Sequence, residues 1–221
     1  MVLDVLIQAA GSGTRLGRGP KAFVSLGGKT LLERAIAQFD GIASRIVVAV
    51  RQDDIERARR LVDRADVACI VGGDSRSDTT RKLIDCATAP LIVLHDVVHP
   101  LLSRELLMRV VTAAQAHGAA APGLLSTEFL FDRAGNVLHR PGEVLAGQKP
   151  VAFGREAIMA GYAAAAESLF EHDPSLLEVL ELGGTHTVFV EGDVRNVKIT
   201  TPGDLDLATA LLALAPPQPG A

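Results

Sequence analysis

A glycine-rich segment near the start of the chain combines residue types that bind phosphate. It reads Gln8-Ala9-Ala10-Gly11-Ser12-Gly13-Thr14-Arg15-Leu16-Gly17 and is followed by Pro20-Lys21. Small residues let backbone N–H groups approach phosphate oxygens, while Arg15 and Lys21 supply the positive charge that a triphosphate requires. We therefore expect a polyphosphate site here, with the small residues contributing through Ala9, Ala10, Gly11, Ser12 and Gly13.

Two familiar phosphate-binding motifs do not fit this segment. A dinucleotide fingerprint would place its third glycine where Leu16 stands, and a P-loop that ends in Gly28-Lys29-Thr30 would need glycine in place of Phe23. Taken alone, the segment could also be a solvated glycine-rich turn, since glycine motifs carry a real false-positive risk. Other polar segments of the chain therefore decide its interpretation.

Two such segments follow apolar runs that are typical of buried strands. Gly72-Gly73-Asp74-Ser75-Arg76-Ser77-Asp78-Thr79 follows the third run, and His95-Asp96-Val97-Val98-His99-Pro100 follows the fourth. An open parallel sheet binds ligands at the carboxyl ends of its strands. Asp96 is thus a candidate ligand for Mg²⁺ or a ribose, with a turn cap as the alternative, and Asp74 and Asp78 could instead cap the next helix.

A last polar cluster combines Gly192-Asp193 with the segment from Asn196 to Pro202. Lys198 lies there within an apolar, strand-like run, so its ammonium either extends to solvent or binds a phosphate. His95 and His99 are single histidines near a loop, and neither is predicted to act as an acid or base.

The elements that would position these residues alternate between short apolar runs and helical patterns. One helix has a clear start, with Thr30 as the N-cap residue and Glu33 three residues later as a capping box. The series predicts an α/β fold, a Rossmann-like three-layer sandwich with a mostly parallel sheet. The expected strands are 5–7, 46–50, 68–71, 91–94 and 187–190, and the further helices are 55–62, 78–86, 105–117, 155–167 and 204–214.

One stretch breaks the alternation and predicts a protruding β-arm over about residues 124–145. Phe129-Leu130-Phe131 and Val137-Leu138 flank a turn-like Ala134-Gly135-Asn136, as in a hairpin. Because an isolated hairpin is marginally stable in water, we expect this apolar arm to pack on a partner subunit in a homodimer. Residues 1–215, the arm included, are expected to form a single domain, and the Pro/Gly-rich residues 216–221 a disordered tail.

Composition excludes several classes of function. The 221 residues are 48% hydrophobic and 22% charged, as in ordinary globular proteins, and a net charge of -4 argues against a nucleic-acid partner. The first apolar run, Val2 to Ala10, contains Asp4 and lacks a basic lead-in, so it is expected to be neither a signal peptide nor a membrane span. The two cysteines, Cys69 and Cys86, suit buried thiols in a reducing cytoplasm.

In their order along the chain, these segments resemble the 2-C-methyl-D-erythritol 4-phosphate cytidylyltransferase family and the related pentitol-phosphate cytidylyltransferases. The matching segments are 9–15 with 20–21, 72–79, 95–100, the arm, 149–151, 172–173 and 192–205. The resemblance implies transfer of CMP from CTP to a small phosphorylated alcohol, with Mg²⁺ as cofactor, in a homodimer. It implies catalysis by Arg15, Lys21 and Lys198, binding of CTP by Gly73, Asp74, Arg76, Thr79 and Asp96, and binding of the acceptor by His99, Thr127, Arg140, Lys149, Asp173 and Lys198.

The departures from the family pattern concentrate on the acceptor side. His99 replaces an arginine, Lys149-Pro150-Val151 replaces Thr-Pro-Gln, and His172-Asp173 replaces Thr-Asp. A neutral histidine offers no bidentate fork to a phosphate, so we expect Lys149 to restore the charge, unless it is merely a solvated loop lysine. The identity of the acceptor stays open: a pentitol phosphate or phosphonate is one alternative, and a sugar-phosphate nucleotidyltransferase that uses another base is a second.

Overall fold

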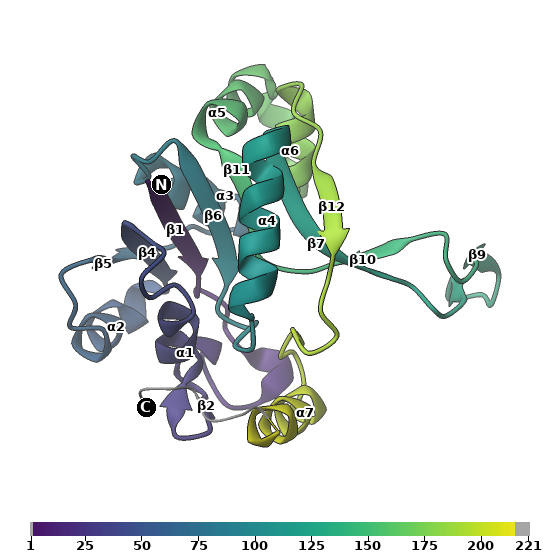
Figure 1. Cartoon of the computed structure of the whole chain (residues 1–221). Coiled ribbons are helices and arrows are strands. Elements are labelled where there is room, and N and C mark those ends of the chain that lie inside the picture. Colours follow the sequence, from purple (N-terminus) through teal and green to yellow (C-terminus); the bar gives the residue numbers. More distant parts are fainter. Residues whose placement is uncertain (1, 215–221) are drawn as a thin grey trace.

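The computed structural model describes residues 2–214 as a central sheet with helices on both faces (Figure 1). The sheet has eight strands in this part of the chain. Seven of them follow the order β10-β7-β11-β6-β1-β4-β5, and the eighth, β12, lies off this path and pairs with β7. The three-layer α/β fold predicted from the sequence is confirmed.

The parallel half of the sheet leads into the segments that were predicted to bind CTP. Strand β1 (Leu3–Gln8) lies between β4 (Arg45–Val50) and β6 (Leu91–Asp96), and β5 (Val67–Val71) pairs with β4. These are the strands expected from continuous apolar runs, and β1, β4 and β6 are buried on both faces. All four strands therefore end at the same edge of the sheet.

Two apolar clusters, one on each face of the sheet, fix its position between the helices. Leu3, Val5 and Ile7 of β1 join the cluster under the helices α1 (Leu31–Ala37), α2 (Ile55–Leu61), α4 (Arg104–His117) and α7 (Pro202–Ala213). Leu6 points the other way, because successive side chains of a strand alternate between its two faces. It joins the cluster under α3 (Arg76–Asp85), α5 (Arg155–Ala164) and α6 (Leu176–Leu182).

The start of α1 follows the sequence prediction. The Thr30 hydroxyl accepts a hydrogen bond from the Glu33 N–H, and the Glu33 carboxylate accepts one from the Thr30 N–H. Four short 3₁₀ helices occur in the described chain: η1 (Thr14–Leu16), η2 (Lys21–Phe23), η3 (Gln52–Asp54) and η4 (Glu167–His172). A small separate hairpin joins β2 (Ser25–Leu26) to β3 (Lys29–Thr30).

The other half of the sheet is mixed, which the simple crossover pattern did not predict. Strand β11 (Val151–Gly154) runs antiparallel to both β6 and β7 (Ala119–Leu125), and β10 (Leu145–Gly147) runs antiparallel to β7. Strand β12 (Val188–Glu191) was expected and pairs parallel with β7. The predicted helix 155–167 is shorter than expected, since α5 ends at Ala164 and η4 begins at Glu167.

The predicted β-arm is present and projects away from the sheet (Figure 1). Its two short strands, β8 (Leu130–Phe131) and β9 (Val137–His139), pair antiparallel around a turn that Asp132 holds. The carboxylate of Asp132 accepts hydrogen bonds from the N–H groups of Ala134 and Asn136, and Gly135 has a φ of 88°. The arm leaves the apolar side chains of Phe129, Leu130, Phe131, Val137 and Leu138 exposed.

The structure also bears on the predictions for the two cysteines, for Lys198, for the C-terminal tail and for a membrane span. Cys69 and Cys86 are both free but half-buried rather than fully buried. Lys198 lies in an extended segment that forms no strand; the Ile199 N–H donates to the carbonyl of Val98 instead. The predicted tail, 216–221, lies outside the described residues. Within residues 2–214, no helix has the length and apolar character needed to cross a bilayer.

Candidate active site

A cleft of about 430 Å³ opens at the carboxyl ends of β1, β5 and β6. The structure brings together here the glycine-rich loop, the loop that opens α3, the end of β6 and Lys198. This is the edge at which an open parallel sheet binds ligands. The predicted residues that line the cleft are Ala10, Gly11, Ser12, Gly13, Arg15, Lys21, Gly73, Asp74, Arg76, Thr79, Asp96 and Lys198. Ala9 is buried at the end of β1, just outside this lining.

The glycine-rich loop has a conformation that depends on glycine at one position in particular. Gly13 has a φ of 74°, and a Cβ atom built on it would lie 2.0 Å from the carbonyl oxygen of Gly19. Any side chain at this position would therefore force the two halves of the loop apart. By holding the halves together, Gly13 places Arg15 and Lys21 on the same wall of the cleft.

That wall carries a cluster of positive charge. The Nζ atom of Lys21 donates to the carbonyl of Ile199 at 3.0 Å, which ties the loop to the segment that bears Lys198. Partial burial lowers the pKa of Lys21, and the neighbouring charges of Arg15 and Lys198 lower it further. Three cations that repel one another in the free protein are arranged to bind a polyanion.

The loop at the start of α3 forms the opposite wall and is held by its own hydrogen bonds. The Gly73 N–H donates to the Thr79 hydroxyl at 2.9 Å, and the Asp74 N–H donates to the Asp78 carboxylate at 3.1 Å. Asp78 is thus a structural residue of this loop, but neither it nor Asp74 caps α3 as the alternative interpretation predicted, because the N-cap residue is Ser75. Asp74 keeps its carboxylate free of these bonds and lines the cleft.

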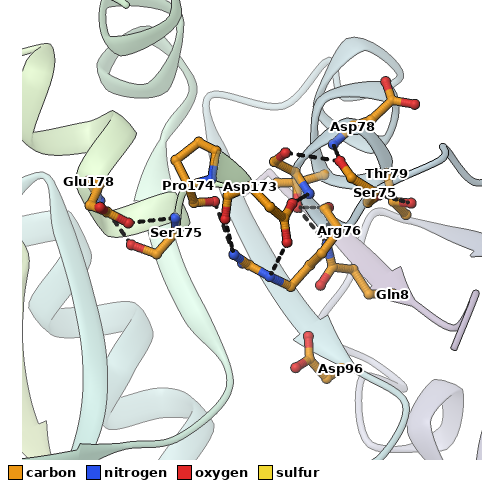
Figure 2. Close-up of polar contacts among 12 residues, drawn as sticks. Gln8, Ser75, Arg76, Asp78, Thr79, Asp96, Asp173, Pro174, Ser175 and Glu178 are labelled. Carbon is orange, nitrogen blue, oxygen red and sulfur yellow. Dashed lines mark hydrogen bonds and ion pairs between the residues drawn. The ribbon is translucent and has the colours of Figure 1, made fainter. Parts of the chain in front are cut away.

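Arg76, which lines the cleft, also contacts a segment beyond it. Its guanidinium turns from the cleft edge toward the segment after η4, as Figure 2 shows. It donates to the carbonyls of Asp173 and Pro174 at 2.9 and 3.0 Å. Asp173, predicted to bind the acceptor, accepts a hydrogen bond from the Ser77 N–H at 2.7 Å. Both side chains therefore hold protein segments together in this structure.

Asp96 ends β6 on the floor of the cleft. Its Oδ1 atom is buried and has no hydrogen-bond partner, and the Nζ atom of Lys149 lies 3.8 Å away, beyond hydrogen-bonding distance. Burial alone would raise the pKa of Asp96, but the surrounding charges, that of Lys149 foremost, together outweigh it and keep that pKa below its ordinary value. An ionised carboxylate oxygen without a donor is the type of ligand that Mg²⁺ takes alongside phosphate oxygens.

The two histidines after β6 are buried beneath the cleft. His95 is fully buried and donates from Nε2 to the carbonyl of His99, whose Nδ1 lies 3.4 Å from the carbonyl of Asn196. Burial lowers the pKa of His95 to about 3 and that of His99 to about 4, so both rings are neutral at pH 7. His99 is only 4% exposed, so in this conformation it supports the cleft floor rather than contacting an acceptor as expected.

The remaining acceptor-side residues are not gathered within this one chain. Lys149 reaches the edge of the cleft beside Asp96, with its side chain 19% exposed. Thr127 and Arg140 belong to the arm, which extends away from the body that contains the cleft (Figure 1). The Arg140 N–H donates to the Glu143 carboxylate within the arm.

Sequence reasoning missed two glutamines that position the site. Gln8, at the end of β1, donates to the carbonyl of Arg76 at 3.2 Å and to the Thr80 hydroxyl, so it fixes the start of α3. Gln148 donates to the carbonyl of Asp193 at 2.8 Å and accepts from the Asp193 N–H at 3.0 Å. The place of Gln8 at a strand end was a usable signal, whereas nothing local marked Gln148.

The chain is similar to proteins of one known family in both sequence and structure. Residues 3–214 match the family model described as 2-C-methyl-D-erythritol 4-phosphate cytidylyltransferase. Proteins of that name from Thermus thermophilus and Deinococcus radiodurans are 38% and 35% identical to it, over 96% and 93% of this chain and 97% and 88% of theirs. The crystal structure of that enzyme from Thermus thermophilus superposes with a TM-score of 0.81 at 31% identity, covering 97% of this chain and 100% of the other. The chain therefore belongs to the 2-C-methyl-D-erythritol 4-phosphate cytidylyltransferase family.

Proposed function

We propose that this chain transfers CMP from CTP to 2-C-methyl-D-erythritol 4-phosphate and releases pyrophosphate. One observation carries the proposal: Arg15, Lys21 and Lys198 face a single cleft whose other wall is the Gly73–Thr79 loop and whose floor is Asp96. Such a site can bind a triphosphate and a second phosphate side by side. The relatives that share the family name support the choice of substrates.

In the proposed reaction, an oxygen of the acceptor phosphate attacks the α-phosphorus of CTP in line. A new P–O bond forms, the bond between the α-phosphorus and the bridging oxygen breaks, and pyrophosphate leaves. Because the acceptor phosphate is already anionic, the protein needs no general base; its task is to align two polyanions and to offset the growing charge. Arg15, Lys21 and Lys198 perform that task, which agrees with the neutral state of His95 and His99.

Mg²⁺ is the proposed cofactor. Among residues 2–214, no three His, Cys, Asp or Glu side chains converge on a metal site, so the ion would be held by Asp96 together with oxygens of the triphosphate. When bound, it would neutralise phosphate charge and favour the departure of pyrophosphate. The unpartnered Oδ1 atom of Asp96 supports this assignment.

On the acceptor side, Lys149 takes the part of the missing arginine. It and Lys198 both lie close enough to Asp96 to lower its pKa, so both are within reach of a phosphate above the cleft floor. The replacement of the family's arginine by His99, with Lys149 as the source of charge, is the observation that favours a second candidate acceptor, a pentitol phosphate. We give 2-C-methyl-D-erythritol 4-phosphate precedence because the similarity to enzymes of that name spans nearly the whole chain.

The active unit is proposed to be a homodimer in the cytoplasm, with the arm of each chain reaching the acceptor site of the other. The exposed apolar side chains of the arm, such as Phe131 and Leu138, support this because an apolar hairpin left in water would be an aggregation hazard. Crossing of the arms would bring Thr127 and Arg140 to a cleft that they do not reach in their own chain.

A nucleotide panel tests the reaction class. Pyrophosphate release is measured with CTP, UTP, ATP and GTP, each with and without the acceptor. We expect release only when CTP and the acceptor are both present. Equal release with UTP or ATP would indicate a nucleotidyltransferase for another base, and release without an acceptor would indicate simple hydrolysis.

A further inference from the structure

The turn after η4 is joined to the nucleotide side of the cleft at Asp173 and Pro174, and Asp173 makes most of the contacts. Asp173 has a φ of 50°, and it is the only residue other than glycine in the described chain with a positive φ. This left-handed conformation is uncommon for residues with a side chain, although aspartate tolerates it better than most. The turn therefore retains a residue conformation that is sparsely populated and needs support from its surroundings.

In this conformation, both the carboxylate and the backbone of Asp173 face α3. Oδ1 accepts from the Ser77 N–H at 2.7 Å, and Oδ2 lies 3.5 Å from the Nε atom of Arg76. The carbonyls of Asp173 and Pro174 both accept from the same nitrogen of Arg76, as Figure 2 shows. One turn thus binds the first two residues of α3 through the Ser77 N–H and the Arg76 guanidinium.

The first turn of α3 in turn holds the cleft wall. The Thr79 hydroxyl accepts from the Gly73 N–H and donates to the Ser75 carbonyl at 2.9 Å. Gly73, Asp74, Ser75 and Thr79 all line the cleft. A shift at the start of α3 would therefore change the shape of the wall that faces the nucleotide.

We propose that Asp173 is a positioning residue for CTP: it acts through Arg76 and Ser77 to hold the Gly73–Thr79 loop in its binding conformation, and it does not contact the acceptor. This rests on the proposed function for the identity of the nucleotide. The proposal also gives the Arg76 guanidinium a role that does not require contact with phosphate. The turn after η4, which lies between α5 and α6, would thus influence the affinity for the nucleotide through its contact with α3.

The test compares variants that separate charge, hydrogen bonding and backbone strain. Asp173→Gly removes the carboxylate but suits the positive φ, whereas Asp173→Asn keeps an acceptor oxygen for the Ser77 N–H and also tolerates the left-handed region. Ser175→Ala is the matched control, because Ser175 lies two residues away and caps α6 with Glu178 instead of holding α3. Binding of CTP is measured by calorimetry without acceptor, and KM for each substrate is measured separately.

Asp173→Gly should weaken CTP binding about three- to tenfold, the range expected for loss of a hydrogen bond and an ion pair. Asp173→Asn should recover most of that loss, and Ser175→Ala should bind CTP within about twofold of the parent. The KM for the acceptor should stay within about twofold in all three. Because the calorimetry needs no turnover, a parent that binds CTP but transfers nothing would refute the proposed function alone.

Two results would overturn the inference. One is unchanged CTP affinity in Asp173→Gly with a raised KM for the acceptor, which would make Asp173 an acceptor ligand. The other is equal weakening by Ser175→Ala, which would indicate general loosening of the turn. If Asp173→Gly does not fold, Arg76→Lys tests the same link, because lysine cannot reproduce the guanidinium contacts. Arg76→Lys should then weaken CTP binding, and an unchanged affinity would overturn the inference.

Discussion

The Nζ atom of Lys149 lies 3.8 Å from Oδ1 of Asp96, and both side chains are less than one-fifth exposed. This pair joins the two sides of the proposed site, since Asp96 lines the cleft and Lys149 is the residue that we propose for the acceptor phosphate. Because Oδ1 has no hydrogen-bond donor, the pair is an electrostatic contact that an incoming cation or phosphate can rearrange.

Replacing Lys149 should affect the acceptor far more than CTP. We expect Lys149→Ala to raise the acceptor KM about three- to tenfold, because a charge-assisted contact to its phosphate is lost, with the KM for CTP within about twofold. Steady-state kinetics with one substrate saturating and the other varied give both values. Lys29→Ala, at an exposed lysine outside the cleft, is the control. An unchanged acceptor KM would mean that Lys149 is a solvated loop lysine.

Lys21 is predicted to act on the transition state. Loss of one preorganised charge donor typically lowers kcat by about 10²–10³, so Lys21→Ala should show a fall of that size at saturating CTP. Arg18→Ala is the matched control, since Arg18 lies in the same loop but does not line the cleft. Single-turnover kinetics separate the chemical step from product release. If Lys21→Ala changed only the KM for CTP, Lys21 would be a binding residue.

The buried histidines predict a loss of stability on acidification. Their pKa values of about 3 and about 4 lie below the ordinary 6.5, so between pH 6.5 and 4 the unfolded chain binds protons that the native state excludes. The free energy of unfolding should therefore decrease as the pH is lowered through that window. The decrease should be about 1.4 kcal/mol per pH unit for each histidine near pH 5.

Urea unfolding from pH 7 to 4.5 measures that slope. His99→Asn retains a donor close to the Nδ1 position but does not titrate, so its slope should be smaller than that of the parent by the contribution of one histidine. Identical slopes for His99→Asn and the parent would show that His99 is not held neutral by burial.

Crossing of the arms can be tested by complementation. In the proposed homodimer, Lys21→Ala would disable a cleft and Arg140→Ala would disable an arm, so each variant alone should be nearly inactive. Random mixing by reversible unfolding should restore roughly a quarter of the parental activity, because half of the dimers are mixed and each contains one complete site. No recovery, in a mixture shown to exchange subunits, would place Arg140 in its own chain's site or outside the site.

The sequence predicted the strands that are defined by their own apolar runs, and it missed those defined by their neighbours. Strand β7 reads Ala-Ala-Ala-Pro-Gly-Leu-Leu, which lacks β-branched residues and contains Pro122 and Gly123. It forms because β10, β11 and β12 pair with it. Helix α6 was also missed, although Ser175 and Glu178 are a capping-box signal.

In the site, too, the sequence predicted what local patterns determine and missed what depends on contacts between distant segments. Residues at the ends of β1, β5 and β6 were predicted to meet because parallel strands end at one edge of a sheet. The contact between Arg76 and Asp173 joins residues 97 apart in the chain, and no local pattern indicated it. The burial of His99 was likewise hidden, because it depends on Asn196 and on the packing beneath the cleft.

The central claim is tested most directly by identifying the product. The purified chain is incubated with CTP, Mg²⁺ and 2-C-methyl-D-erythritol 4-phosphate, and the phosphorus-containing products are followed by ³¹P NMR and mass spectrometry. We predict one cytidine diphosphate ester of the acceptor for each pyrophosphate released, with kcat/KM at least about tenfold above that for ribitol 5-phosphate. No CTP-dependent ester of 2-C-methyl-D-erythritol 4-phosphate, from a preparation that converts another phosphorylated alcohol, would contradict the account.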